Sequence, residues 1–258
     1  MSRTTKPFYM ALLLAVVLVP FLADNVFAKG DTIVWQGTVT VKKTYTVTKG
    51  KTLEIRPGTK VLFSKGATLS VKGALKASGR KGEEILFTSA KKSAKGAWHE
   101  IMLDSADDSI MEHCTIENAA WGIHSHDTRL KLSNCTIRNS EVGLRFRSGP
   151  LAISNCRFTG NRIGLRSYQG IAQITDSDFT NNEIGIFVRE KGSGLTITRS
   201  NFYNNSSFSD FNDEDVKATD NWWGTDDPLQ TIFDARNEPG IGQVWYEPFR
   251  REQVRHAL

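Results

Sequence analysis

The sequence predicts an all-β fold, a parallel β-helix in which about nine coils of about 21 residues stack into a solenoid. Three observations predict it. Cys114, Cys135 and Cys156 are spaced by 21 and 21 residues. Apolar and glycine positions around each cysteine repeat with it, and the units read as short alternating strands separated by Asn and Gly, without helical periodicity. One such coil cannot bury its own inner face, so stacked coils must share a core. The series continues at Ser177, Ser200 and Asn221.

The solenoid is expected to occupy residues 29–224. Its first part is less regular, but alternating apolar pairs separated by Gly-containing bends continue the pattern there: Leu53/Ile55, Val61/Phe63, Leu69/Val71 and Ile85/Phe87. An open solenoid end exposes unpaired strand edges, which proteins usually cover. We therefore expect residues 225–258, with Trp245, Pro248 and Phe249, to form a C-terminal cap. The segment around Trp35 is expected to cap the other end.

The first 28 residues predict a secretory signal peptide. Arg3 and Lys6 precede an apolar stretch from Phe8 to Leu22, and Val26-Phe27-Ala28 supplies small residues at a cleavage site. The apolar stretch is short for a membrane span, and no second one follows. The sequence thus predicts a periplasmic or extracellular protein with no membrane span after cleavage.

Charge is distributed unevenly along the expected mature chain. Residues 29–100 carry 15 Lys/Arg and 5 Asp/Glu, a net +10, whereas residues 101–258 carry 16 and 22, a net −6. A basic end on an exported protein could meet acidic polysaccharide, lipid headgroups or nucleic acid. Because the lysines alternate with apolar residues, we favour an ordinary solvated surface.

The repeated cysteines and asparagines are interpreted as structural. Ser177 and Ser200 continue the cysteine series, so a small buried side chain at a tight bend accounts for all members. A Cys114–Cys135 or Cys135–Cys156 disulfide, or a metal, is the alternative. Asparagine tolerates left-handed backbone and bonds locally, which suits bends.

The outward positions carry the functional hypothesis. Strand alternation after each repeated glycine predicts two outward columns on one face. Guanidinium groups bind carboxylates bidentately, and Tyr and Phe rings could stack on sugars, so this face predicts a groove for an anionic glycan. An ordinary polar strand face is the alternative. The first column is His124, Arg145, Arg166 and Phe187, and the second is His126, Arg147, Tyr168 and Arg189.

Several segments resemble exported right-handed β-helix proteins of the pectin-lyase-like superfamily. The resemblance implies right-handed coiling over most of residues 33–249, and it implies no single activity, because this fold carries lyases, hydrolases, epimerases, adhesins and scaffolds. The segments that carry it are Pro57–Phe63, Phe87–Ser89, Gly96–Ile101, the Cys114–Ile186 coils, Asn221–Gly224 and Trp245–Pro248.

The same resemblance makes catalysis the weaker hypothesis. Lyases of this fold combine a Ca²⁺-holding carboxylate cluster with a basic residue, and hydrolases group two or three Asp, whereas the two columns contain no carboxylate. His124 is a weak candidate for a general base, with Arg145 stabilising developing charge. His124-x-His126 supplies only two metal ligands, so no metal site is assigned.

Two acidic segments are interpreted as solvated loops, with Ca²⁺ binding as the alternative. They are Asp104/Asp107/Asp108 and Asp210/Asp213/Glu214/Asp215.

The sequence therefore predicts an exported, non-catalytic binding or scaffold protein that needs no cofactor. Its expected partner is acidic polysaccharide or another envelope component. The alternative is a polysaccharide lyase, epimerase or hydrolase that uses the same face. Nucleic acid would also suit arginines and aromatics, but the predicted export argues against it.

Overall fold

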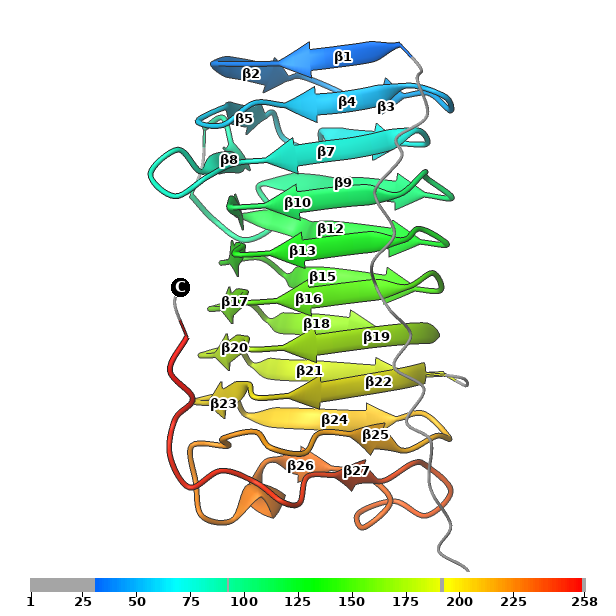
Figure 1. The fold of residues 1–258 in the computed structure, drawn as a ribbon, viewed down its shortest axis with the longest axis vertical. Helices are drawn as coiled ribbons and strands as arrows, with labels where there is room; N and C mark the ends of the chain where they lie inside the picture. The colour runs from blue at the N-terminus through cyan, green and yellow to red at the C-terminus, as the bar shows by residue number, and fades with distance from the viewer. Residues whose placement is uncertain (1–30, 92, 191–192, 257–258) are drawn as a thin grey trace, which may run out of the picture.

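The computed structural model describes residues 31–91, 93–190 and 193–256. They form an elongated solenoid in which the chain passes in turn through three sheets (Figure 1). Neighbouring strands pair in parallel, so the predicted parallel β-helix of about nine coils is confirmed. The predicted signal peptide lies outside the described residues. Within the described ranges, no helix has the length and apolar character needed to cross a membrane.

Sheet A faces the viewer in Figure 1 and contains ten strands. They are β1 (Thr32–Trp35), β4 (Thr52–Ile55), β7 (Ala74–Ser78), β10 (Ser109–Glu112), β13 (Leu130–Ser133), β16 (Leu151–Ser154), β19 (Gly170–Thr175), β22 (Ser193–Thr198), β25 (Val216–Lys217) and β27 (Val244–Trp245).

Sheet B contains eight strands. They are β2 (Thr38–Val41), β5 (Lys60–Phe63), β8 (Ile85–Ser89), β11 (Cys114–Glu117), β14 (Thr136–Arg138), β17 (Arg157–Thr159), β20 (Asp178–Thr180) and β23 (Asn201–Tyr203).

Sheet C contains nine strands, and a short 3₁₀ helix, η1 (Pro228–Gln230), precedes the last of them. They are β3 (Tyr45–Val47), β6 (Thr68–Val71), β9 (Trp98–Asp104), β12 (Ala119–His126), β15 (Val142–Arg147), β18 (Ile163–Ser167), β21 (Ile184–Arg189), β24 (Ser207–Phe211) and β26 (Ile232–Phe233).

The cysteines form the predicted core ladder. Cys114, Cys135 and Cys156 are buried and free of disulfide bonds. The backbone N–H of Cys135 donates to the Sγ of Cys156 at 3.4 Å, and the N–H of Cys156 donates to the Oγ of Ser177 at 3.1 Å. The side chain at this position thus satisfies a buried backbone donor of the preceding coil, a task that sulfur, hydroxyl and amide oxygens share.

The asparagines also have the predicted structural role, in two sets. Asn139 and Asn181 lie at bends with φ of 49° and 54°, a backbone region that asparagine tolerates. Asn161 is buried, accepts the N–H of Ser140 at 3.0 Å and donates to the carbonyl of Ile137 at 3.0 Å. Buried asparagines at this repeated position link each coil to the next by hydrogen bonds, at the bend between sheets B and C.

The repeated glycines of sheet C are explained by the closeness of successive coils. A Cβ at Gly122 would lie 2.5 Å from the carbonyl oxygen of Gly143, and one at Gly143 would lie 2.6 Å from the oxygen of Gly164. No side chain fits there, so the three glycines bring the coils together directly before the outward columns begin.

The C-terminal segment adds strands to the end of the solenoid and then runs back along its outer side. Strand pairing continues past residue 224, because β24 pairs with β26 and β25 pairs with β27. The chain then returns beside sheet B (Figure 1), where Asn201 bonds the backbone of Val254 and His256 lies 3.3 Å from Asp178. At the other end β1, β2 and β3 form the first coil, and Trp35 packs edge-on against Tyr45.

Candidate binding face

The outer side of sheet C presents the predicted columns in the predicted register. His124 pairs with Arg145, and Arg145 pairs with Arg166. His126 pairs with Arg147 in the second column. We call this surface, defined by the eight column residues together with Trp121, the sheet C face. Its register follows from the constant 21-residue coil, which keeps strand alternation in phase from β12 to β18.

Two column residues are less accessible than strand alternation predicts. His124 is 5% exposed and Tyr168 is 7% exposed, although both were expected to face solvent. The ring of Trp121 packs edge-on against His124 at 4.6 Å, and two guanidinium groups contact the ring of Tyr168. Tyr168 therefore supports its neighbours and has little free ring surface to offer a sugar.

The two arginines of the first column lie between aromatic side chains of the sheet C face. The guanidinium carbon of Arg145 lies 4.6 Å from the ring centre of Trp121 and 4.7 Å from that of Tyr168. That of Arg166 lies 4.9 Å from Tyr168 and 5.5 Å from Phe187. A guanidinium group donates its hydrogen bonds in its own plane, so ring contacts over its faces hold it in place without using its donors.

Within the described residues, three of the four arginines of the sheet C face lack a carboxylate partner of the kind that several arginines elsewhere on the solenoid have. Within the described ranges, no carboxylate lies within ion-pair distance of Arg145, Arg166 or Arg189, and the Nε atoms of Arg145 and Arg166 are buried without a hydrogen-bond partner. Arg147 lies 4.0 Å from Glu190. Several arginines on the other surfaces pair with a carboxylate one coil away: Arg129–Asp108, Arg138–Glu117, Arg157–Asp178, Arg162–Glu141 and Arg199–Asp176.

One functional group of the face was not identified by the sequence analysis, which stated only that the two columns themselves contain no carboxylate. Glu100 is 7% exposed, and its Oε2 accepts the Nδ1–H of His124 at 2.8 Å. Asp104 pairs in register with His126, so it ends the second column and does not lie in a loop. The strand register shifts by one residue between Trp121 and Ile123, and this shift places Asp104 opposite His126, whereas Glu100 precedes the shift and pairs with Trp121.

His126 completes a hydrogen-bonded chain that begins at Glu100. The Nε2 atoms of His124 and His126 are 2.8 Å apart. Partial burial, followed by the charges of His124 and Arg145, lowers the pKa of His126 from its usual value, and the carboxylate of Asp104 acts in the opposite sense. His126 is therefore neutral at pH 7 and retains a nitrogen lone pair for a proton or another ligand.

The acidic segments only partly match their interpretation as solvated loops. Asp107 and Asp108 are exposed, and Asp108 pairs with Arg129 at 3.3 Å. Asp210, in contrast, is fully buried in β24, and burial raises its pKa to about 6. Across the described residues, no group of three or more His, Cys, Asp or Glu side chains is arranged to hold a metal ion.

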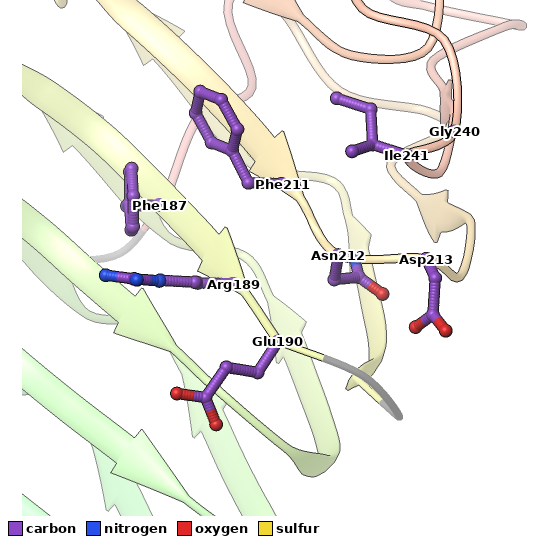
Figure 2. A pocket seen from close by; sticks show the side chains of 8 residues that line it. All are labelled: Phe187, Arg189, Glu190, Phe211, Asn212, Asp213, Gly240 and Ile241. Carbon is purple, nitrogen blue, oxygen red and sulfur yellow. The ribbon is translucent and has the colours of Figure 1, made fainter.

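The sheet C face opens into a hollow of about 560 Å³ at its C-terminal end. Figure 2 shows the side chains of Phe187 and Arg189 projecting from β21 and that of Phe211 from β24, with Ile241 on a separate loop. Phe211 is 38% exposed and its ring lies 5.5 Å from that of Phe187. The lining combines aromatic surface with charged groups: Phe187, Arg189, Glu190, Phe211, Asn212, Asp213, Gly240 and Ile241.

Comparisons with known proteins agree with this architecture. The model of a family described as "Right handed beta helix region" matches residues 87–222, which is more than half of the chain. No curated protein and no solved structure was found to match. The matched segment contains the coils that build the sheet C face, from β11 to β23, and the chain belongs to the right-handed β-helix family.

Proposed function

We propose that this protein is a binding module that holds acidic polysaccharide along the sheet C face. The observation that carries the proposal is the contrast between two groups of arginines. On the other surfaces Arg138, Arg162 and Arg199 each have a carboxylate partner one coil away. Within the described residues, Arg145, Arg166 and Arg189 of the sheet C face have none. The uronate carboxylates of an acidic glycan are ligands that guanidinium groups bind well.

The geometry supports a chain-like ligand more than a small one. Arg145 and Arg166, the two arginines of the first column, stand on strands one spacing apart, about 4.8 Å, so a ligand must supply repeated negative charges to meet both. Like charges at this spacing repel each other by about 1 kcal/mol even in water-like surroundings. A polyanion relieves this repulsion at several coils together. The hollow beside Phe187 and Phe211 offers apolar surface at one end of the same path.

A matched pair of triple variants tests the proposal. Arg145, Arg166 and Arg189 are replaced with Gln in the first variant, and the paired Arg138, Arg162 and Arg199 are replaced with Gln in the second. Both remove three positive charges. Binding to polyuronate and to neutral dextran is measured by retention and by calorimetry at two salt concentrations.

The first variant is expected to lose polyuronate affinity by about tenfold or more, and the second by no more than about twofold. Salt should weaken wild-type binding, and dextran should not bind. Equal losses in both variants would mean that net charge alone retains the polyanion, and the proposal would fall.

The hydrogen-bonded chain from Glu100 through His124 to His126 favours one alternative function. In this alternative the protein is a lyase, epimerase or hydrolase that acts at the same face. A carboxylate that orients one imidazole is a recurrent feature of acid–base sites. The same incubations are therefore assayed for unsaturated and reducing ends and for changed uronate stereochemistry. Product that disappears in His126→Ala would replace the binding proposal with a catalytic one.

A further inference from the structure

His124 and His126 direct two ring nitrogens toward each other from one strand. Their Nε2 atoms are 2.8 Å apart, their ring planes are at 89°, and their ring centres are 4.4 Å apart. A straight N–H···N bond would hold the rings end to end, with the centres farther apart than the nitrogens by a full ring diameter. The observed ring centres are closer together than an end-to-end arrangement requires, so the rings meet at an angle. Two imidazoles that ligate one cation from adjacent positions have this arrangement.

Glu100 prepares His124 for such a role. Its Oε2 accepts the Nδ1–H of His124 at 2.8 Å, which leaves Nε2 of His124 unprotonated, with its lone pair directed toward His126. Metal-binding histidines commonly donate their other N–H to a carboxylate in this way, and the contact fixes the tautomer and raises ligand basicity. Glu100 and His124 are both buried, so the orientation is set before a cation arrives.

Charge around the pair does not oppose a cation. Arg145 and Arg147 are positive neighbours of His126, and Asp104 and Glu100 are negative ones, so the four balance. His126 is only half-buried, so water or an anion can reach the remaining coordination positions.

The separation of the nitrogens indicates which cations fit. Two nitrogens 2.8 Å apart subtend about 85° at a metal that lies about 2.05 Å from each. A tetrahedral ion such as Zn²⁺ would need the nitrogens about 3.4 Å apart. Adjacent positions of a tetragonal ion are near 90°, the geometry that Cu²⁺ and Ni²⁺ adopt with nitrogen and oxygen ligands. We propose that His124 and His126 form a binding site for one tetragonal divalent cation, with Cu²⁺ as the best match, on the sheet C face.

Titration of the untagged, metal-free full chain with Cu²⁺ in a non-coordinating buffer tests the proposal, with Zn²⁺ as the comparison ion. Calorimetry gives the affinity and stoichiometry, and electron paramagnetic resonance reports the nitrogens bound to Cu²⁺. The test variants are His126→Ala and Glu100→Gln. The control is His113→Asn, because Asn134 and Asn155 occupy the same left-handed bend position in the next two coils.

Wild type and His113→Asn are expected to bind one equivalent of Cu²⁺ with two-nitrogen hyperfine structure, and to bind it more tightly than Zn²⁺. His126→Ala should lose this site while circular dichroism shows an intact fold. Glu100→Gln should weaken binding by about 10- to 100-fold. No binding by the wild type, or an unchanged site in His126→Ala, would overturn the proposal. Arg145→Gln should leave Cu²⁺ binding in place, which separates this test from that of the proposed glycan binding.

Discussion

The guanidinium carbon of Arg145 lies 4.7 Å from the centre of the Tyr168 ring, one coil further along the chain. The same ring lies 4.9 Å from the guanidinium carbon of Arg166. One nearly buried aromatic side chain therefore contacts two like charges on adjacent strands and keeps both in fixed positions. This contact makes the two side chains that the proposed function uses most into a rigid pair, which lowers the conformational entropy lost when a ligand binds.

Replacing Tyr168 with Leu tests this role without removing a charge. Each cation–π contact contributes about 0.5–2 kcal/mol, and loss of both frees the two arginines. We expect polyuronate affinity to fall by about three- to tenfold. Tyr168→Phe keeps the ring and should bind as the wild type does. Calorimetric titration of folded protein measures the change, and equal affinities for the Leu and Phe variants would refute a positioning role.

The cysteine ladder predicts different tolerances at Cys156. Its Sγ accepts the N–H of Cys135, as the Oγ of Ser177 accepts the N–H of Cys156. Cys156→Ser retains the acceptor, so its stability should stay within about 0.5 kcal/mol of wild type. Cys156→Ala leaves the buried N–H of Cys135 unpaired and should cost about 1–3 kcal/mol. Urea unfolding curves separate the two, and a Ser variant as unstable as the Ala variant would contradict the ladder.

Cys114, Cys135 and Cys156 are all buried, so a thiol reagent cannot reach them in the folded chain, and burial also raises the pKa of the Cys114 and Cys156 thiols. A thiol reagent should detect all three cysteines only after denaturation, without added reductant. Fewer than three thiols in the denatured chain would mean that a disulfide had formed.

Spacing alone predicted the parallel β-helix and the register of the sheet C face, because the coil length is constant from Cys114 to Ser177. Counting back 21 residues from His124 gives Leu103, but the structure pairs His124 with Met102. The one-residue shift at Trp121 depends on how β9 packs, and no repeated residue in the sequence marks it. For this reason Asp104 could not be assigned from the repeat as the partner of His126. Glu100 keeps the 21-residue spacing from Trp121, but the repeat does not show that its side chain reaches His124.

The sequence pattern also could not predict how deeply the column residues are buried. Strand alternation states which side of the sheet a residue occupies, and it says nothing about which way a long side chain leans. Tyr168 lies on the predicted side, yet it is covered because the guanidinium groups of Arg145 and Arg166 both pack against its ring. Asp210 was read as part of an acidic loop, but it takes the inward position that Val188 holds in the paired strand.

Because successive coils touch at the repeated glycines, we predict that alanine is tolerated poorly at these positions and better at a glycine with more space around it. A Cβ at Gly143 would lie 2.6 Å from the carbonyl oxygen of Gly164 and 3.0 Å from the Cγ2 of Ile137. Gly143→Ala should therefore lower the free energy of unfolding by about 1–3 kcal/mol. Gly194→Ala is the matched control, because a Cβ there meets no atom closer than 3.6 Å. Thermal unfolding of both variants measures the contrast, and equal melting temperatures would show that the coils can separate at no cost.

Asp210 predicts that the stability of the C-terminal coils falls as the pH rises. Its carboxyl group is fully buried, its Oδ2 has no hydrogen-bond partner, and burial raises its pKa from 3.8 to about 6. Between about pH 4 and 6 the folded chain holds a proton that the unfolded chain has released. The free energy of unfolding therefore decreases through this window, by a total of about 3 kcal/mol from this group, and the loss is complete above pH 6.

Asp210→Asn isolates this contribution. The amide oxygen can still accept the N–H of Asn212, which bonds Oδ1 at 3.1 Å, and no charge is buried at any pH. The variant should be more stable than wild type at pH 7, by about 1–3 kcal/mol, and about equal to it at pH 4. The exposed Asp107→Asn serves as the control for the loss of one negative charge. Urea unfolding at pH 4, 5, 6 and 7 gives the difference directly. Parallel stability curves for wild type and Asp210→Asn across this range would show that the carboxyl is already ionised at pH 4, and that water or a cation reaches it in the folded chain.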